Sequence, residues 1–328
     1  MPLVTLIVFV IFQDVLIANF IATSTKKAIG TFLRRYPYTP PMDKKQIGVL
    51  AIVGASIMWA IEPIFAKLAY SNASVVQTSA FRAIFVTIVA LIYALTTNGR
   101  NIKITKKEFS VIFYIAVVGT LIADLLFYIA LTKIPVLNAV LIGHLQPIFI
   151  IFIGYFILRN EKHSKYDYIG IFVMIVGALL VTTQTLENLL VLRIGTIGDL
   201  LVIGATVSWA TTGVIARKYL KTMNCGIITF YRFLIAAIFF SIYLIFKSEF
   251  QFGSVNQIII GVIVGVGYIL YYEGLKRVKA AQAGALELST PFFAAILGFL
   301  VLGEIVTPMQ IIGILILCVG VYLLSKKE

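Results

Sequence analysis

Long apolar segments alternate with short polar connections along most of this chain. Ten of the segments approach or exceed the roughly 20 residues that an α-helix needs to cross a lipid bilayer. They cover residues 47–68, 75–97, 109–130, 136–158, 168–183, 197–216, 225–246, 257–275, 280–302 and 308–324. This pattern predicts an all-α integral membrane protein with ten transmembrane helices.

Lysine and arginine divide unevenly between the two alternating sets of connections. The set that includes the C-terminus carries most of them, whereas the opposite set carries only Lys67, Lys133, Arg193 and Lys247. Cytoplasmic loops of membrane proteins carry the excess of these two residues. We therefore expect a multi-pass protein of the cell membrane whose C-terminus lies in the cytoplasm.

The sequence after the fifth segment repeats the sequence before it. The stretch IMWAIEPIFAK aligns with VSWATTGVIAR, and FYIALTKIPVLNA aligns with YYEGLKRVKAAQA. The matched residues include Trp59 and Trp209, Arg82 and Arg232, and Pro147 and Pro291. We expect two repeats, at residues 47–184 and 196–325. Because each repeat has five helices, the second must enter the membrane from the opposite face, an architecture found in many secondary transporters.

Residues 1–42 lie outside both repeats and have two interpretations. Residues 2–21 form a further apolar stretch, interrupted by Asp14 and Asn19, which predicts an accessory N-terminal helix. Alternatively, translation starts at Met42, where the stretch MDKKQIG resembles a natural start. The sequence leaves both interpretations open.

The composition excludes several classes of protein. Of the 328 residues, 60% are hydrophobic and 12% are charged, whereas soluble domains have about 45–50% apolar and about 25% charged residues. The surplus of apolar side chains must therefore face lipid. The net charge of +13 does not indicate a nucleic-acid partner, because the basic residues cluster in the connections. The expected partners are the bilayer and a small-molecule substrate, and a homodimer stays possible.

The sequence lacks the residues of a metal centre or a nucleotide-driven pump. His144 and His163 are its two histidines, and Cys225 and Cys318 both lie inside apolar segments. No phosphate-binding loop of the form GxxxxGK[ST] occurs. We therefore expect no metal, no cofactor and no enzymatic activity.

The matched tryptophans, arginines and prolines, with the closing stretch GFLVLGEIVTPMQIIGILILCVGVYL, resemble the EamA family of the drug/metabolite transporter superfamily. The resemblance covers residues 48–324; it departs in the first repeat, where LRNE stands in place of LGE. It implies a carrier of ten helices in two repeats that exports metabolites or amino-acid-like compounds. Members of the family are often coupled to ion or proton gradients.

Polar residues inside the apolar segments are the expected site. Pro147 and Pro291 each lie near the middle of a segment, where proline frees the carbonyl four residues earlier to face protein or a water-filled cavity. Arg82 and Arg232 must face the interior because a charge in lipid is costly. They either bind carboxylate or phosphate groups or form ion pairs that lock helices, and both hypotheses stay open. The predicted substrate-binding residues are Trp59, Glu62, Arg82, Asp124, Tyr128, His144, Pro147, Trp209, Arg232, Tyr272, Glu287 and Pro291.

Two of the acids, Glu62 and Glu287, are the expected proton-coupling residues, because an intramembrane acid can carry a proton. Glycines at helical spacing, such as Gly261 and Gly265, are expected to let helices pack closely. Together these features predict a secondary transporter of small polar, amino-acid-like metabolites that exports them by alternating access. An organic-phosphate or nucleotide-sugar exchanger and a membrane-embedded enzyme are the alternatives.

Overall fold

The computed structural model describes residues 44–99, 101–158, 165–190, 195–220, 222–278, 283, 286, 287 and 289–325. The accessory helix and the start at Met42 that the sequence suggests lie outside these residues. All secondary structure in the described part of the chain is helical. Seven of its helices are long and apolar enough to cross a membrane. These are Gln46–Ala69, Val75–Asn98, Lys106–Leu131, Val136–Gly154, Ile197–Ala216, Cys225–Phe246 and Val255–Leu275.

The helices follow the apolar segments of the sequence closely. The first half contains α3 (Lys44–Ala69), α4 (Val75–Asn98), α5 (Lys106–Tyr114), η2 (Ile115–Asp124), α6 (Leu125–Leu131), α7 (Val136–Gly143), α8 (Gln146–Leu158), α9 (Lys165–Thr183) and α10 (Leu186–Leu190). The second half contains α11 (Ile197–Tyr219), α12 (Cys225–Phe246), α13 (Val255–Leu275), α15 (Ser289–Leu302) and α16 (Pro308–Ser325).

Several helices begin at a residue pattern that satisfies their first backbone N–H groups. At the start of α4, the Ser74 side chain accepts from the Gln77 backbone while the Gln77 side chain accepts from the Ser74 backbone. The same reciprocal capping box begins α11, with Thr196 and Asp199. Such boxes fix where each helix starts, and therefore fix the depth of every side chain along it.

Two predicted segments are interrupted. The segment around residues 109–130 forms α5, η2 and α6 in continuous succession, and η2 is a ten-residue π-helix. Pro147 was expected to lie in the middle of one helix and to free a carbonyl there, and that expectation was wrong. The segment at 136–158 forms α7 and α8, because the chain turns at His144 and Leu145. Pro147 then lies in the first turn of α8, where a missing N–H leaves no helix bond unmade.

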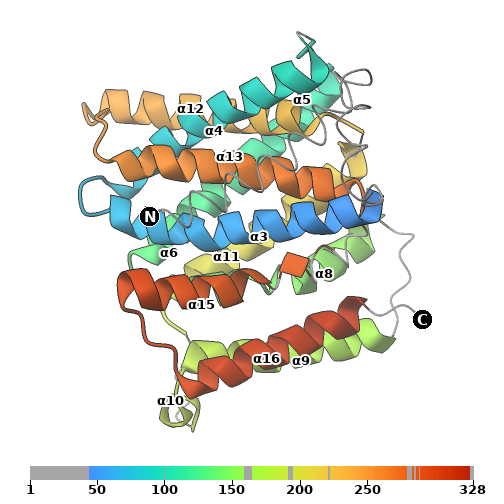
Figure 1. The fold of residues 1–328 in the computed structure, drawn as a ribbon, viewed down its shortest axis with the longest axis vertical. Helices are drawn as coiled ribbons and strands as arrows, with labels where there is room; N and C mark the ends of the chain where they lie inside the picture. The colour runs from blue at the N-terminus through green and yellow to red at the C-terminus, as the bar shows by residue number, and fades with distance from the viewer. Residues whose placement is uncertain are drawn as a thin grey trace, which may run out of the picture.

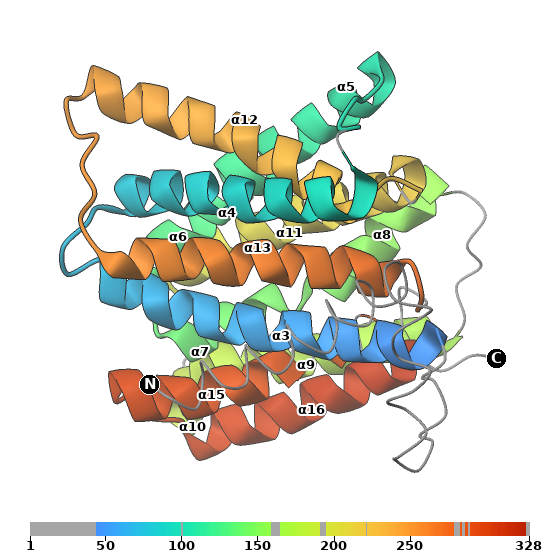
Figure 2. The ribbon, with the colours of Figure 1, turned by 45° about the horizontal axis from the view of Figure 1, so that its top comes forward.

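Helices from the two halves of the chain pack in pairs. Helix α3 packs against α13, α4 against α12, α7 against α15, and α9 against α16. Helix α11 packs against η2 and α6. Figures 1 and 2 show α3 beside α13, and α9 beside α16 at the edge of the bundle. Almost every helix of the first half thus has its main neighbour in the second half.

Glycine allows the closest of these approaches. A Cβ atom added at Gly261 of α13 would lie 2.3 Å from Cβ of Phe85 on α4, and one at Gly265 would lie 3.0 Å from Cβ of Val89. On the other side of the bundle, a Cβ at Gly320 would lie 3.0 Å from the backbone oxygen of Gly170. The expectation that the spaced glycines serve helix packing is confirmed at these positions.

Candidate functional site

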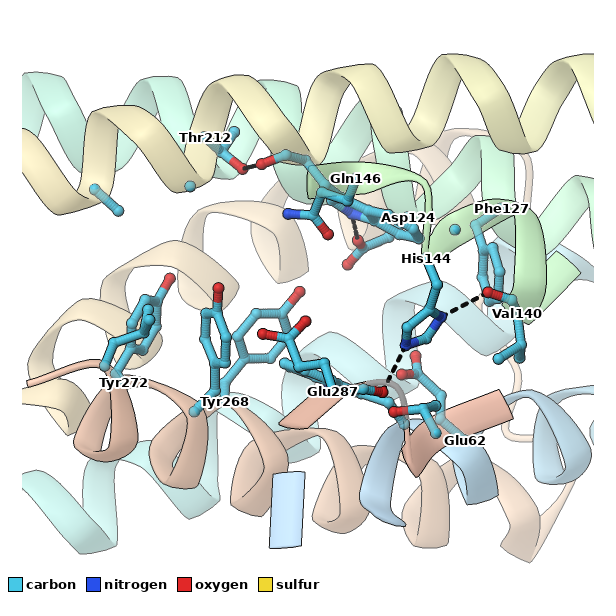
Figure 3. A pocket seen from close by; sticks show the side chains of 18 of the residues that line it. Glu62, Asp124, Phe127, Val140, His144, Gln146, Thr212, Tyr268, Tyr272 and Glu287 are labelled. Carbon is cyan, nitrogen blue, oxygen red and sulfur yellow. Dashed lines mark hydrogen bonds between the residues drawn. The ribbon is translucent and has the colours of Figure 1, made fainter. Parts of the chain in front are cut away.

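A cavity of about 150 Å³ lies among the helices of both halves (Figure 3). Its polar lining residues are Glu62, Arg82, Asp124, His144, Gln146, Thr212, Arg232, Glu287 and Thr290. Its aromatic lining residues are Trp59, Phe127, Trp209, Tyr268, Tyr271 and Tyr272. Small and aliphatic side chains complete the wall. A mixed lining of rings and converging polar groups is typical of a small-molecule site.

Most of the residues predicted from the sequence lie in this wall. They are Trp59, Glu62, Arg82, Asp124, His144, Trp209, Arg232, Tyr272 and Glu287. Tyr128 is not in the wall but supports Glu62 from behind it. Pro291 is buried outside the lining, and the side chain of Pro147 is outside the described part of the structure.

The list of predicted binding residues did not include several other members of the wall. Tyr268 precedes Tyr272 by one helical turn, a spacing that places both on one face of α13. Thr212 aligns with Glu62 in the repeat, and Thr290 lies beside Pro291. These spacings and alignments could have identified the three residues from the sequence. No spacing or repeat position in the sequence singles out Tyr271 or Gln146, because single aromatic and amide residues are frequent near membrane helices.

Arg82 of α4 is held by two carboxylates. It donates a hydrogen bond of 2.8 Å to Oε1 of Glu62 on α3 and a short one to Oδ2 of Asp124 at the end of η2. The hydroxyl of Tyr128 also donates to Oε1 of Glu62, over 2.8 Å. The guanidinium carbon lies 4.7 Å from the centre of the Tyr128 ring. Arg82 therefore joins three helices through ion pairs that are largely buried.

Asp124 connects this cluster to the second half of the chain. Its other oxygen, Oδ1, accepts a hydrogen bond of 2.8 Å from Nε1 of Trp209 on α11. Nε1 of Trp209 also lies 3.2 Å from the backbone oxygen of Gly119 in η2. Each oxygen of Asp124 thus has a partner on a different helix.

Arg232 of α12 is surrounded by hydroxyl groups instead of carboxylates. Its Nε donates to Oγ1 of Thr120 over 2.7 Å, and its terminal nitrogens lie 3.0 Å from the hydroxyl of Tyr268 and 3.4 Å from that of Tyr272. The guanidinium carbon lies 4.3 Å from the centre of the Tyr268 ring. Among the described residues, no carboxylate lies within ion-pair distance of this side chain. Arg232 is nevertheless only 3% exposed.

The π-helix places three of these contacts. Gly119, Thr120 and Asp124 all belong to η2. A Cβ atom at Gly119 would lie 3.1 Å from a terminal nitrogen of Arg232, so glycine leaves room for the guanidinium there. π-helical turns occur frequently at functional sites. Here the π-helix contacts both arginines, Arg82 through Asp124 and Arg232 through Thr120.

His144 bridges the two halves at the break between α7 and α8. Its Nδ1 lies 2.7 Å from the backbone oxygen of Val140, and its Nε2 lies 2.9 Å from the backbone oxygen of Glu287 (Figure 3). Glu287 is four residues before Pro291, which lies in the first turn of α15 and has no N–H to donate to the Glu287 carbonyl. A neutral imidazole can donate to only one of the two carbonyls, whereas a doubly protonated ring donates to both.

The carboxylate of Glu287 has a different environment from that of Glu62. Glu287 lines the cavity, and its side chain makes no hydrogen bond or ion pair within the described part of the chain. Glu62, in contrast, accepts from both Arg82 and Tyr128. The two acids are therefore not equivalent. Among the described residues, no group of three or more His, Cys, Asp or Glu side chains is arranged to hold a metal ion.

Comparison with known proteins gives this arrangement a family. Residues 46–183 and 196–326 both match the sequence model of the EamA-like transporter family. The chain belongs to that family. The family, together with seven helices long and apolar enough to cross a bilayer, makes the chain a multi-pass membrane transporter.

Relatives of this EamA-like transporter are found in archaea and bacteria. A protein of Methanothermobacter thermautotrophicus named an uncharacterized transporter is 25% identical, over 84% of this chain and 85% of its own length. The uncharacterized transporter YyaM of Bacillus subtilis is 26% identical, over 83% and 91%. The riboflavin transporter ImpX of Fusobacterium nucleatum is 25% identical, over 69% and 80%. One solved structure shares the fold with a TM-score of 0.62 at 14% identity, covering 84% of this chain and 95% of its own.

The cavity of the EamA-like transporter extends toward one end of the bundle. Ala216 lies in the last turn of α11 and Leu275 is the last residue of α13, and both line the cavity. This is the end with most of the lysines and arginines, which we call the basic end. At the opposite end, Lys67 at the end of α3 bonds Glu304 after α15. That ion pair joins the helices around the other end of the cavity.

Proposed function

We propose that this transporter exports small polar metabolites, with the size and charge of amino acids, across the cytoplasmic membrane by alternating access. The observation that carries the proposal is the cavity that places two arginines, three acids and a group of aromatic rings among helices of both halves. Charged side chains at membrane depth are costly, and in membrane proteins they mark substrate or ion pathways. A transport pathway through the cavity gives them a function.

Two inverted repeats of five helices, at 47–184 and 196–325, form the second part of the proposal. The mutual packing of α4 with α12, of α7 with α15 and of α9 with α16 supports it, because each pair joins equivalent helices. A pair of glycine contacts also supports it. A Cβ at Gly48 would lie 2.7 Å from Cβ of Arg277, and one at Gly198 would lie 3.2 Å from Cβ of Lys133. Gly48 aligns with Gly198 and Lys133 with Arg277, so the two contacts are the same contact seen from each repeat.

Alternating access requires a closure at one end of the cavity at a time. The extension of the cavity toward the basic end, and the Lys67–Glu304 ion pair at the opposite end, support a state that is open toward the basic end. The excess of basic residues assigns that end to the cytoplasm. A site open toward the cytoplasm is the state in which an exporter binds its substrate.

The volume of the cavity favours a small substrate. A protein cavity of about 150 Å³ holds a molecule such as benzene, and the volume here is about the same. Amino acids and small organic acids are of this order, whereas a nucleotide sugar is much larger. An organic phosphate of similar size is the second candidate, because Arg232 could bind its phosphate. Of the two arginines in the cavity wall, Arg232 alone has no carboxylate within ion-pair distance among the described residues, which favours a singly charged group over a phosphate dianion.

Glu287 and Glu62 are the proposed proton-coupling acids, with Glu287 as the more direct one. Glu287 lines the cavity without a side-chain partner in the described part of the chain, so protonation there breaks no ion pair. Glu62 can accept a proton only by weakening its bond to Arg82. A proton taken up at Glu287 would change the charge of the site as substrate enters or leaves.

Counterflow in proteoliposomes tests the proposal. Vesicles containing the purified full-length protein are loaded with unlabelled L-amino acids, and labelled amino acids are added outside. We expect accumulation above that of protein-free vesicles for at least one amino acid. Accumulation only of organic phosphates such as glycerol 3-phosphate would support the second candidate. If no compound showed counterflow, transport of small polar metabolites would be contradicted. It would also be contradicted if the protein converted the added compound chemically instead of moving it.

A further inference from the structure

The two arginines related by the repeat have different counter-charges. In the alignment of the repeats, Glu62 corresponds to Thr212, and Asp124 corresponds to Tyr268. Arg82 bonds both of the acids in the first repeat. At the equivalent positions of the second repeat, both carboxylates are replaced by hydroxyl-bearing side chains. Two similar sites thus differ in net charge.

The difference leaves one buried cation without a carboxylate in direct contact. The hydroxyl oxygens of Thr120, Tyr268 and Tyr272 can accept hydrogen bonds from Arg232, but they carry no negative charge. A buried charge is stable only when it is paired and hydrogen-bonded. Arg232 is hydrogen-bonded and unpaired among the described residues, and it lines the cavity. A negative charge in direct contact with Arg232 can therefore come from a molecule in the cavity.

We propose that Arg232 binds an anionic group of the transported solute, a carboxylate or another monoanion of similar size, and that Arg82 does not. This assignment rests on the proposed transport function and specifies its substrate. Arg82 is a structural residue that joins α3, α4 and η2. The Thr290 hydroxyl supports the assignment independently, since it is buried in the same wall and has no hydrogen-bond partner among the residues that the structure describes. It offers the solute a second polar contact.

The molecule contains its own reporter of this site. The sequence has two tryptophans, and both Trp59 and Trp209 line the cavity. Their fluorescence therefore reports on solutes that enter it. Iodide quenches tryptophan as an anion, caesium as a cation and acrylamide as a neutral molecule. Comparison of the three quenching constants distinguishes electrostatic attraction of an anion from general access of small molecules to the cavity.

The experiment measures quenching of the purified full-length protein and of three variants. Arg232→Gln removes the cation, and Tyr268→Asp places beside it the counter-charge that Asp124 provides in the first repeat. Lys247→Gln removes the same charge from an exposed site after α12 and is the matched control. If Arg232→Gln does not fold, Tyr268→Asp still neutralises the site.

We expect the iodide quenching constant to fall at least threefold in Arg232→Gln and Tyr268→Asp. Two unit charges about 6 Å apart attract enough for roughly a threefold change in local concentration even at the dielectric constant of water. Acrylamide quenching should not change, and Lys247→Gln should behave as wild type. The assignment would be overturned if the iodide quenching constant changed only in proportion to the acrylamide quenching constant in all four proteins. It would also be overturned if neither quencher reached the tryptophans of the wild-type cavity.

The result is independent of the transport assay. Counterflow with an amino acid, together with iodide quenching that Arg232→Gln leaves unchanged, would support the proposed function and refute this site for the anion. Loss of iodide quenching in a protein that shows no counterflow would support the anion site and refute transport. The two proposals can therefore fail separately.

Discussion

Lys67 donates a hydrogen bond of 2.9 Å to Glu304 and joins the end of α3 to the connection after α15. The same carboxylate accepts from the backbone N–H groups of Val136, at 2.9 Å, and Leu137, at 3.4 Å. Glu304 therefore bonds the N-terminus of α7, where a negative charge is favourable. One side chain holds three helices together at the end opposite the basic end.

Glu304→Gln should increase the fraction of time for which the cavity is accessible from the end opposite the basic end. The substitution removes an ion pair and weakens the bonds to α7, and hydrogen bonds to charged groups contribute about 1.5–3 kcal/mol. We expect a cysteine at Ala139 to react about ten times faster with a membrane-impermeant methanethiosulfonate added from the opposite end, since 1.4 kcal/mol is tenfold. The background carries Cys225→Ser and Cys318→Ser. Glu187→Gln on the exposed helix α10 is the control, and equal rates in both variants would show that Glu304 is not a closure.

Arg82→Gln should destabilise the protein more than Arg232→Gln. Removing Arg82 leaves the buried carboxylates of Glu62 and Asp124 unpaired, and breaking a buried pair in this way costs about 3–5 kcal/mol. Removing Arg232 leaves only neutral hydroxyl groups, and an unpaired buried hydroxyl costs far less than an unpaired buried charge. Thermal unfolding in detergent should therefore give a clearly lower midpoint for Arg82→Gln. Equal midpoints would mean that the two arginines are equally neutralised.

Gly261→Ala should separate α13 from α4. The new Cβ would lie 2.3 Å from Cβ of Phe85, and overpacking of this kind costs about 1–3 kcal/mol. Gly204→Ala in α11 is the matched control, because its Cβ would make an ordinary contact of 3.5 Å with Leu126, and alanine favours the helix. We expect a lower unfolding midpoint for the first variant and an unchanged or higher one for the second. The reverse order would contradict the packing of these helices.

Glu287→Gln should separate exchange from gradient-driven transport. The neutral side chain keeps the shape of the cavity but cannot take up a proton. Counterflow should persist, whereas uptake driven by an imposed pH gradient should fall to the level of protein-free vesicles. Glu62→Gln should impair both activities, because it also breaks the ion pair with Arg82. Full gradient-driven uptake by Glu287→Gln would remove Glu287 from the coupling mechanism.

Much of this arrangement could be predicted from the sequence, because it depends on local composition. The length of the apolar segments locates the helices, and the cost of a charge in lipid turns Arg82 and Arg232 toward the interior. Helical spacing brought Glu62 and Trp59 to the same cavity, where the structure places both. The number of membrane spans and the inversion of the repeats stay predictions.

The partners of the buried groups could not be predicted. A π-helix turns less per residue than an α-helix, so the 3.6-residue period does not give the direction of Thr120 or Asp124 in η2. Helix rotation decides that Arg82 meets two acids while Arg232 meets three hydroxyl groups. The bridge from His144 to the backbone of Glu287 joins residues of opposite repeats, and no spacing along the chain signals such a contact.

The inverted arrangement of the two halves is the claim on which the account depends most. It is tested most directly by labelling single cysteines at Asn101, after α4, and at Gln251, after α12, with an impermeant maleimide. The labelling uses intact cells and the Cys225→Ser, Cys318→Ser background. We expect the Gln251→Cys variant to be labelled in intact cells and the Asn101→Cys variant only after permeabilisation. Labelling of both from the same side would show that the halves are not inverted.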